Sequence, residues 1–80
     1  MAASRESAFR KLHDGPDAFI IPNPWDIGTA KFLASLRFKA LATTSAGFAF
    51  SRGLPDGGVD FEAMIAHCRE IVGATDLPVS

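Results

Sequence analysis

The amino-acid sequence predicts an α/β fold that forms the incomplete N-terminal portion of a (β/α)8 (TIM) barrel. Apolar segments at 18–21, 39–44 and 77–80 alternate with longer segments of helical periodicity. Strands that alternate with helices of about 10 to 15 residues indicate βαβ units around a parallel sheet. Because a complete barrel takes roughly 250 residues, the 80 residues fit one helix and about two and a half βα units. We expect one partial domain over 1–80, roughly the N-terminal third of a barrel.

The first helix is expected to begin after Ser4, whose hydroxyl can cap it, and to end near His13. Gly15 and Pro16 oppose its continuation. The continuous apolar run at 18–21 is typical of a strand that is buried on both faces. Because the first helix precedes this strand, we expect it to be an extra element that covers one end of the fold.

The second helix is expected to follow the first strand. Asn23 is a suitable N-cap, and Pro24 then occupies the first helical position, where its missing N–H costs nothing. Asp26 falls at the third position, where a carboxylate favours the helix dipole. We expect this helix to end near Leu36 and Trp25 to be a core or interface aromatic residue.

The last helix has the clearest periodicity in the chain. Asp60 is its expected N-cap, and Gly73 fits its C-terminal end. Its apolar face has a spacing of 3.6 residues and consists of Phe61, Met64, Ile65, Cys68, Ile71 and Val72. His67 lies on the flank of this face, so we expect its side chain to be solvated. A shorter helical turn is expected at 48–50, after the second strand.

Composition limits the classes of function. Eight basic and nine acidic residues give a net charge of −1, with no basic patch for nucleic acid and no acidic tail. The chain has no apolar run of the roughly 20 residues that span a bilayer, so we expect no membrane partner. The single cysteine, Cys68, excludes an internal disulfide and favours a reducing cytoplasm.

Two groups of polar residues follow the predicted strands and are expected on the same rim of the sheet, where reactive groups gather in parallel α/β folds. The first group is Asn23, Trp25 and Asp26. The second group offers the hydroxyls of Thr44 and Ser45, the amides near Ala46, and Asp56. Hydroxyls and unshielded amides can bind an anion. A capping pair at 23–26 and a polar turn at 43–47 are the structural alternatives.

These segments resemble a known pattern. The sequences PNPWDIGTA at 22–30, FKALATTSAGFA at 38–49, GLPDG at 53–57 and IVGATDLPVS at 71–80 are similar to the isocitrate lyase / phosphoenolpyruvate mutase superfamily. The resemblance extends from about residue 9 to residue 80. It is strongest to the branch of carboxyphosphonoenolpyruvate phosphonomutase-like and oxaloacetate decarboxylase-like proteins.

The resemblance implies a complete (β/α)8 barrel, usually a homotetramer, that makes or breaks a C–C or P–C bond. The implied substrate is a small 2-oxo acid, its enolate or a phosphonate, and the implied cofactor is Mg²⁺ or Mn²⁺. By ungapped carry-over, Thr44, Ser45 and Ala46 hold the pyruvate-like carboxylate, and Asp56 supports the metal through water. Amides and hydroxyls suit a carboxylate, and a hard cation prefers carboxylate and water oxygens.

The sequence departs from the family pattern in two places. Arg37 stands where a helix-ending glycine is common, so we expect a strained or differently built turn there. The family's Asp-x-Glu or Asp-x-Asp metal motif is not contained in the 80 residues. The first hypothesis is therefore a fragment of a Mg-dependent lyase or phosphonomutase that is inactive as an isolated chain. The second is a non-catalytic α/β module that self-associates or binds a full-length barrel.

Overall fold

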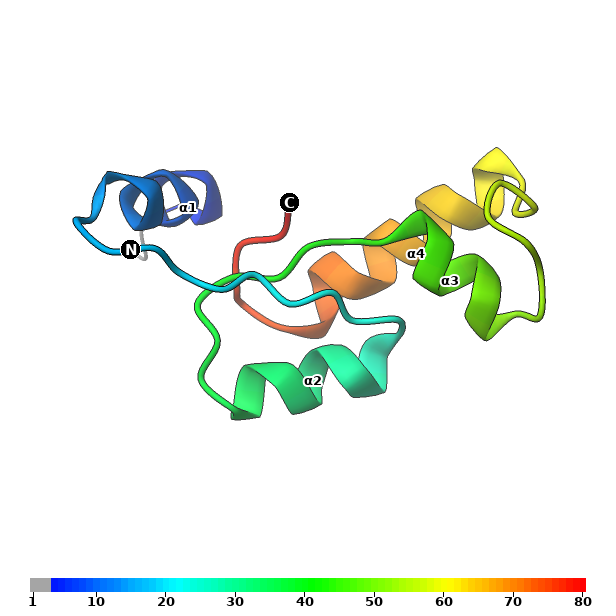
Figure 1. The fold of residues 1–80 in the computed structure, drawn as a ribbon, viewed down its shortest axis with the longest axis horizontal. Helices are drawn as coiled ribbons and strands as arrows, with labels where there is room; N and C mark the ends of the chain where they lie inside the picture. The colour runs from blue at the N-terminus through cyan, green and yellow to red at the C-terminus, as the bar shows by residue number, and fades with distance from the viewer. Residues whose placement is uncertain (1–3) are drawn as a thin grey trace.

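The computed structural model describes residues 4–80, which form four helices joined by extended segments. The helices are α1 (Arg5–Asp14), α2 (Ile27–Ser35), α3 (Ser45–Ser51) and α4 (Phe61–Ala74). Figure 1 shows the extended segments in the middle of the molecule, with α1 near one end and α3 toward the other. Helix α1 thus lies near one end of the described fold, and the expectation that it covers that end of a complete barrel stays a prediction.

The three segments predicted as strands lie parallel to one another, with residues 40–44 in the middle. Leu41 donates its N–H to the carbonyl of Pro78 (2.9 Å) and accepts a bond from the N–H of Ser80 (2.9 Å). On the other edge, Ala42 donates to the carbonyl of Pro22 (3.0 Å). In residues 4–80 only Leu41 and Val79 form a β-bridge, which is parallel, and no longer strand is present.

The prediction of formed strands was therefore wrong in degree, although the parallel arrangement is present. The reason is that a ladder needs several successive pairs on each edge, and 40–44 has one such bond to residue 22. A lone pair of short segments is marginal in water without further partners. The closed barrel stays a prediction.

The core lies where α2 and α4 pack together against the middle segment. Ala30 of α2, Leu41 of the middle segment and Ile71 of α4 are fully buried and in contact. Partly buried apolar residues surround them: Leu33, Ala74, Leu77 and Val79. Full burial of a side chain such as leucine or isoleucine stabilises a fold by about 1.5–3 kcal/mol. Because the cluster draws its residues from α2, the middle segment and α4, this burial stabilises the packing of elements that are distant in sequence.

The predicted caps of the first and last helices are confirmed. Ser4 Oγ accepts a hydrogen bond from the N–H of Ser7 (3.1 Å) at the start of α1. Asp60 Oδ1 accepts one from the N–H of Ala63 (2.8 Å) at the start of α4. The last helix continues past Gly73 to Ala74, one residue beyond the predicted end.

The predicted cap of the second helix was wrong. Asp26, not Asn23, is the N-cap of α2, and its carboxylate accepts bonds from the N–H (2.7 Å) and hydroxyl (2.8 Å) of Thr29. Thr29 Oγ1 in turn accepts a bond from the N–H of Asp26 (3.1 Å), which completes a capping box. These bonds hold the pKa of Asp26 below its ordinary value, with the backbone bond from Thr29 as the largest cause.

The turn after α2 contains the only non-glycine residue of 4–80 with a positive φ. Arg37 has φ of 70°, in the left-handed region that glycine adopts without cost. A side chain in this region costs roughly 1–2 kcal/mol. The strain expected at this turn is thus located on Arg37.

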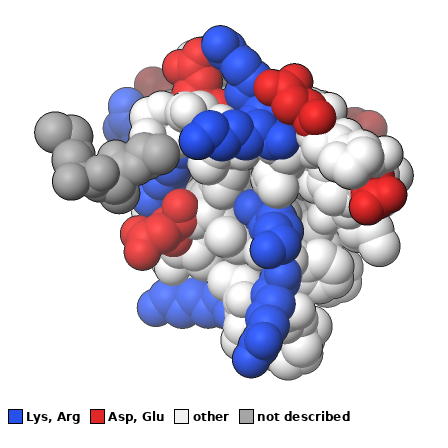
Figure 2. Space-filling view, turned by 90° about the vertical axis from the view of Figure 1, so that its left-hand side faces the viewer, with Lys and Arg blue, Asp and Glu red and all other residues white. Residues whose placement is uncertain are grey.

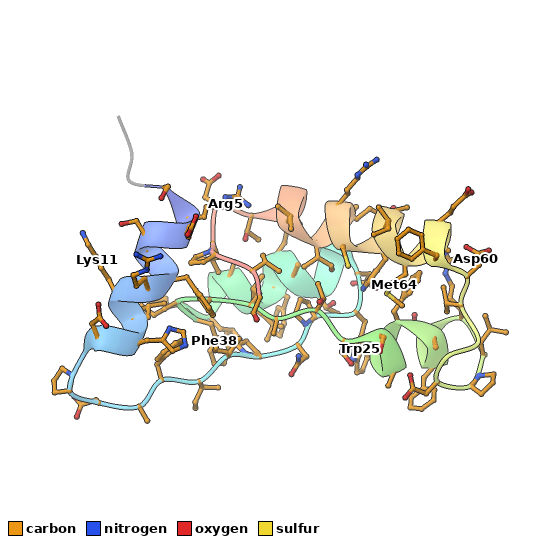
Figure 3. The ribbon with its side chains drawn as sticks, turned by 90° about the horizontal axis from the view of Figure 1, so that it is seen from above. Arg5, Lys11, Trp25, Phe38, Asp60 and Met64 are labelled. Carbon is orange, nitrogen blue, oxygen red and sulfur yellow. The ribbon has the colours of Figure 1, made fainter. Side chains whose placement is uncertain are left out.

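Helix α1 is tied to the C-terminal end of α4. Arg5 Nη1 donates to the carbonyl of Val72 (2.6 Å), and Nη2 lies 3.9 Å from the carboxylate of Asp76. Figure 3 shows Arg5 beside the segment that follows α4. Figure 2 shows Lys and Arg interspersed with Asp and Glu on the face at this end of the molecule. No helix in residues 4–80 is both long enough and apolar enough to cross a membrane.

Candidate functional site

The candidate substrate site is the first turn of α3, where residues 40–44 end. Thr44 caps the helix: its Oγ1 accepts a hydrogen bond from the N–H of Gly47 (3.1 Å), and its carbonyl accepts one from Phe48 (3.0 Å). Ser45 and Ala46 occupy the first two helical positions, where a helix offers no acceptor for the amides. Thr44, Ser45 and Ala46 are therefore adjacent. The helix itself, Ser45–Ser51, is longer than the turn predicted at 48–50.

Trp25 lies directly against this turn. A Cβ placed on Gly47 would lie 2.6 Å from Cγ2 of Thr44 and 2.9 Å from Cδ1 of Trp25, distances at which neighbouring atoms must shift. Figure 3 shows Trp25 beside α3. With Gly47, Phe50 and Ser51, the indole lines an open cavity of about 290 Å³. Trp25 is 54 % exposed, so it is not a core residue.

Asn23 joins the ends of two extended segments. Its side-chain Nδ2 donates to the carbonyl of Ala42 (3.2 Å) and approaches that of Thr43 (3.5 Å). Asn23 therefore does not cap α2 as predicted; its side chain instead binds the backbone of a segment about 20 residues away. These bonds lie immediately before Thr44, so Asn23 helps to fix the position from which α3 starts.

Asp56 lies apart from the first turn of α3. It occupies an exposed turn in which Gly58 donates its N–H to the carbonyl of Pro55 (2.8 Å) and Gly57 has φ of 82°. Figure 1 shows the α3–α4 loop at the outer side of α3, whereas the extended segment that ends at the N-cap Thr44 enters that helix at its inner end. The structure brings Thr44, Ser45 and Ala46 together but does not bring Asp56 to them.

A metal site is not complete within the described residues. Residues 4–80 contain no group of three His, Cys, Asp or Glu side chains that could hold a metal ion. A magnesium ion requires near-octahedral oxygen coordination and usually keeps several waters. Asp56 alone therefore fits only a supporting role through a water molecule.

The prediction that His67 is solvated was wrong. Its side chain is 2 % exposed, and its ring stacks on that of Phe48 with centroids 3.9 Å apart and planes 10° from parallel. Burial is the main cause that lowers the pKa of His67 below its ordinary value. The signal for this burial was its spacing: His67 follows Met64 by three residues and precedes Ile71 by four, which places all three on one helix face.

The sequence and the fold of the chain are similar to those of known proteins. Residues 9–80 match the family model of phosphoenolpyruvate phosphomutase. The chain is 39 % identical over 72 residues to 2-methylisocitrate lyase of Bacillus subtilis (strain 168), which covers 89 % of this chain and 24 % of that protein. The chain thus spans about a quarter of the length of this relative.

Two crystal structures from Burkholderia cenocepacia J2315 are similar to the described fold. One, described as a lyase/mutase, is 59 % identical with a TM-score of 0.90 and covers 94 % of this chain and 27 % of its own. The other, described as a phosphonomutase, is 37 % identical with a TM-score of 0.86 and covers 94 % and 31 %. The matched proteins are a class of lyases and mutases. The chain belongs to the phosphoenolpyruvate phosphomutase family, in the isocitrate lyase / phosphoenolpyruvate mutase superfamily, as its sequence predicted.

Proposed function

We propose that the chain forms the N-terminal part of a lyase or phosphonomutase that acts on a 2-oxo acid, its enolate or a phosphonate. The observation that carries the proposal is the family match over residues 9–80. In this proposal the remaining strands close a (β/α)8 barrel, the complete enzyme is a cytoplasmic homotetramer, and the isolated 80 residues have no activity. The relatives are three to four times longer than the matched segment, which supports the need for more chain.

The proposed carboxylate site is the first turn of α3. The amides of Ser45 and Ala46 are in the first turn, where the helix dipole favours an anion. Thr44 Oγ1 accepts its bond from Gly47, so the hydroxyl hydrogen remains available to donate. The hydroxyl of the exposed Ser45 adds another donor. Hydrogen bonds to a charged carboxylate are roughly twice as strong as bonds between neutral groups.

The proposed cofactor is Mg²⁺ or Mn²⁺, with Asp56 holding a metal-bound water. The principal ligands would have to come from outside residues 4–80, because these residues contain no ligand cluster. Such a cation supplies stabilisation of the negative charge on an enolate oxygen. The residues described here would bind and orient the carboxylate end of the substrate.

Exposed apolar side chains favour a second candidate, a non-catalytic module that self-associates or binds a full-length barrel. Ile20, Phe32 and Phe61 are 72 %, 62 % and 79 % exposed. Exposed apolar surface of this kind often marks an interaction site. In the first proposal the rest of the barrel covers these residues, and in the second a partner protein does.

A grafted enzyme distinguishes the two. In 2-methylisocitrate lyase of Bacillus subtilis, the 72 matched residues are replaced by the matching residues of this chain. We expect the purified grafted enzyme to cleave 2-methylisocitrate with Mg²⁺, and the 80-residue chain alone to show no turnover. A grafted enzyme that is folded and of native size by circular dichroism and sedimentation, yet has no turnover, would contradict the first candidate and favour the second.

A further inference from the structure

His67 is the only buried polar or charged side chain among residues 4–80, and neither ring nitrogen has a hydrogen-bond partner in the protein. A neutral imidazole carries one N–H, and a protonated imidazole carries two. Each buried donor without an acceptor is unfavourable, and a buried unpaired charge is more so. The position therefore tolerates the neutral ring and disfavours the protonated one.

The ring of His67 joins α4 to α3. It covers the ring of Phe48, which lies in the middle of α3 and is buried. Helix α3 has seven residues, and a helix of this length depends on tertiary contacts because it is marginal by itself. Phe48 also lines an open cavity of about 350 Å³, together with Asp60 and Ala63 at the start of α4. The stack with His67 is thus one of the contacts that hold α3 on α4.

Charged groups from three elements act on His67. Arg52, at the C-terminal end of α3, has its guanidinium carbon 5.3 Å from the centre of the Phe48 ring. Its positive charge disfavours the protonated form of His67. Glu70 of α4 and Asp26 at the start of α2 favour the imidazolium. The carboxylate of Asp26 is already bonded to Thr29, and Glu70 is exposed. Burial outweighs both carboxylates, so the pKa of His67 is lowered.

We propose that His67 is an acid-sensitive latch, which holds α3 on α4 while its imidazole is neutral and releases α3 when the imidazole is protonated. The docked state binds the proton less readily than the released state. Docking is therefore strongest above the ordinary histidine pKa of about 6.5 and weakens as the pH falls below it. Helix α3 carries Thr44, Ser45 and Ala46, so release would also dismantle the carboxylate site; that consequence alone depends on the proposed function.

The single tryptophan of the chain reports on the latch without a substrate or a metal. Trp25 contacts Gly47 of α3, so its fluorescence changes when α3 leaves. In the 80-residue chain we expect the emission to shift to longer wavelength between pH 8 and pH 5, while most far-UV helical signal remains. His67→Phe keeps the ring stack without a titrating group and should remove this shift. His13→Gln, a change at the other, exposed histidine, should retain it.

Four results would overturn the proposal. One is the same emission profile in the parent chain and in His67→Phe. Another is simultaneous loss of the whole helical signal with the shift, which indicates general unfolding rather than release of α3. A third is emission at pH 8 that already equals that in denaturant. The fourth is an NMR titration of His67 with a midpoint at or above 6.5. If His67→Phe overfills the site and does not fold, His67→Leu is the replacement variant, with the same expected loss of the shift.

Discussion

Gly47 and Trp25 approach each other so closely that no other residue fits at position 47 without movement. A Cβ on Gly47 would lie 2.9 Å from Cδ1 and 3.1 Å from Nε1 of the indole. The contact links the loop before α2 to the first turn of α3. It therefore fixes the helix that carries Thr44, Ser45 and Ala46.

The first prediction concerns this contact. Gly47→Ala should destabilise the chain by about 1–3 kcal/mol, the usual cost of overpacking, and should change the fluorescence of Trp25. The matched control is Gly73→Ala, because a Cβ at position 73 meets nothing within 4 Å and alanine is favoured within a helix by roughly 0.5–1 kcal/mol. Urea unfolding of both variants measures the difference. Equal stabilities of the two variants would show that neither Trp25 nor Thr44 restricts position 47.

The second prediction concerns the turn after α2. Arg37→Gly should raise stability by about 0.5–1 kcal/mol, because glycine relieves the left-handed strain but loses more conformational entropy on folding. This gain corresponds to a rise of roughly 2–8 °C in the melting temperature of a small domain. Arg37→Ala, which removes the side chain and keeps the strain, is the control. Equal melting temperatures of Arg37→Gly and Arg37→Ala in a thermal melt would show that the backbone is not strained at this residue.

The third prediction concerns the proposed metal. In the grafted enzyme, Asp56→Ala should raise the Mg²⁺ concentration needed for half-maximal activity by about 10–100-fold, as is typical when a group that orients a metal ligand is lost. Asp26→Ala is the comparison: it removes a helix cap bonded to Thr29, so it should lower the melting temperature without changing the metal dependence. Wild-type metal dependence in Asp56→Ala would show that Asp56 is only a turn residue.

Local signals explain why α1 and α4 could be predicted well. The caps Ser4 and Asp60 act within three residues of their own positions, so the sequence alone contains the information. The same reasoning failed at 23–26, where two residues can cap a helix. Asn23 is used instead by the carbonyl of Ala42, 19 residues away, and only the tertiary structure decides between them.

The errors at the strands and at His67 have the same tertiary origin. An apolar run such as 18–21 has strand character, but a ladder forms only where a partner supplies successive hydrogen bonds. A histidine is usually exposed, but the ring of Phe48 covers His67 from another helix. At the candidate site, Thr44, Ser45 and Ala46 are adjacent because they are contiguous in the sequence, and their role stays a prediction. The position of Asp56 relative to them depends on the path of the α3–α4 loop, which no local pattern specifies.

The central claim is that the amides at the start of α3 bind a carboxylate, and proline at position 45 tests it most directly. Ser45 is the first residue of α3, where proline is favoured, and Thr44 has φ of −138° and ψ of 113°, which a following proline accepts. Ser45→Pro removes the amide hydrogen and the hydroxyl, whereas Ser45→Ala removes only the hydroxyl. The measurement is kcat/KM of both variants of the grafted enzyme, with thermal melts as the control for folding. We predict that Ser45→Pro lowers kcat/KM by about 10–100-fold more than Ser45→Ala, as expected for one lost hydrogen bond to a charged group; equal values for the two variants would contradict the claim.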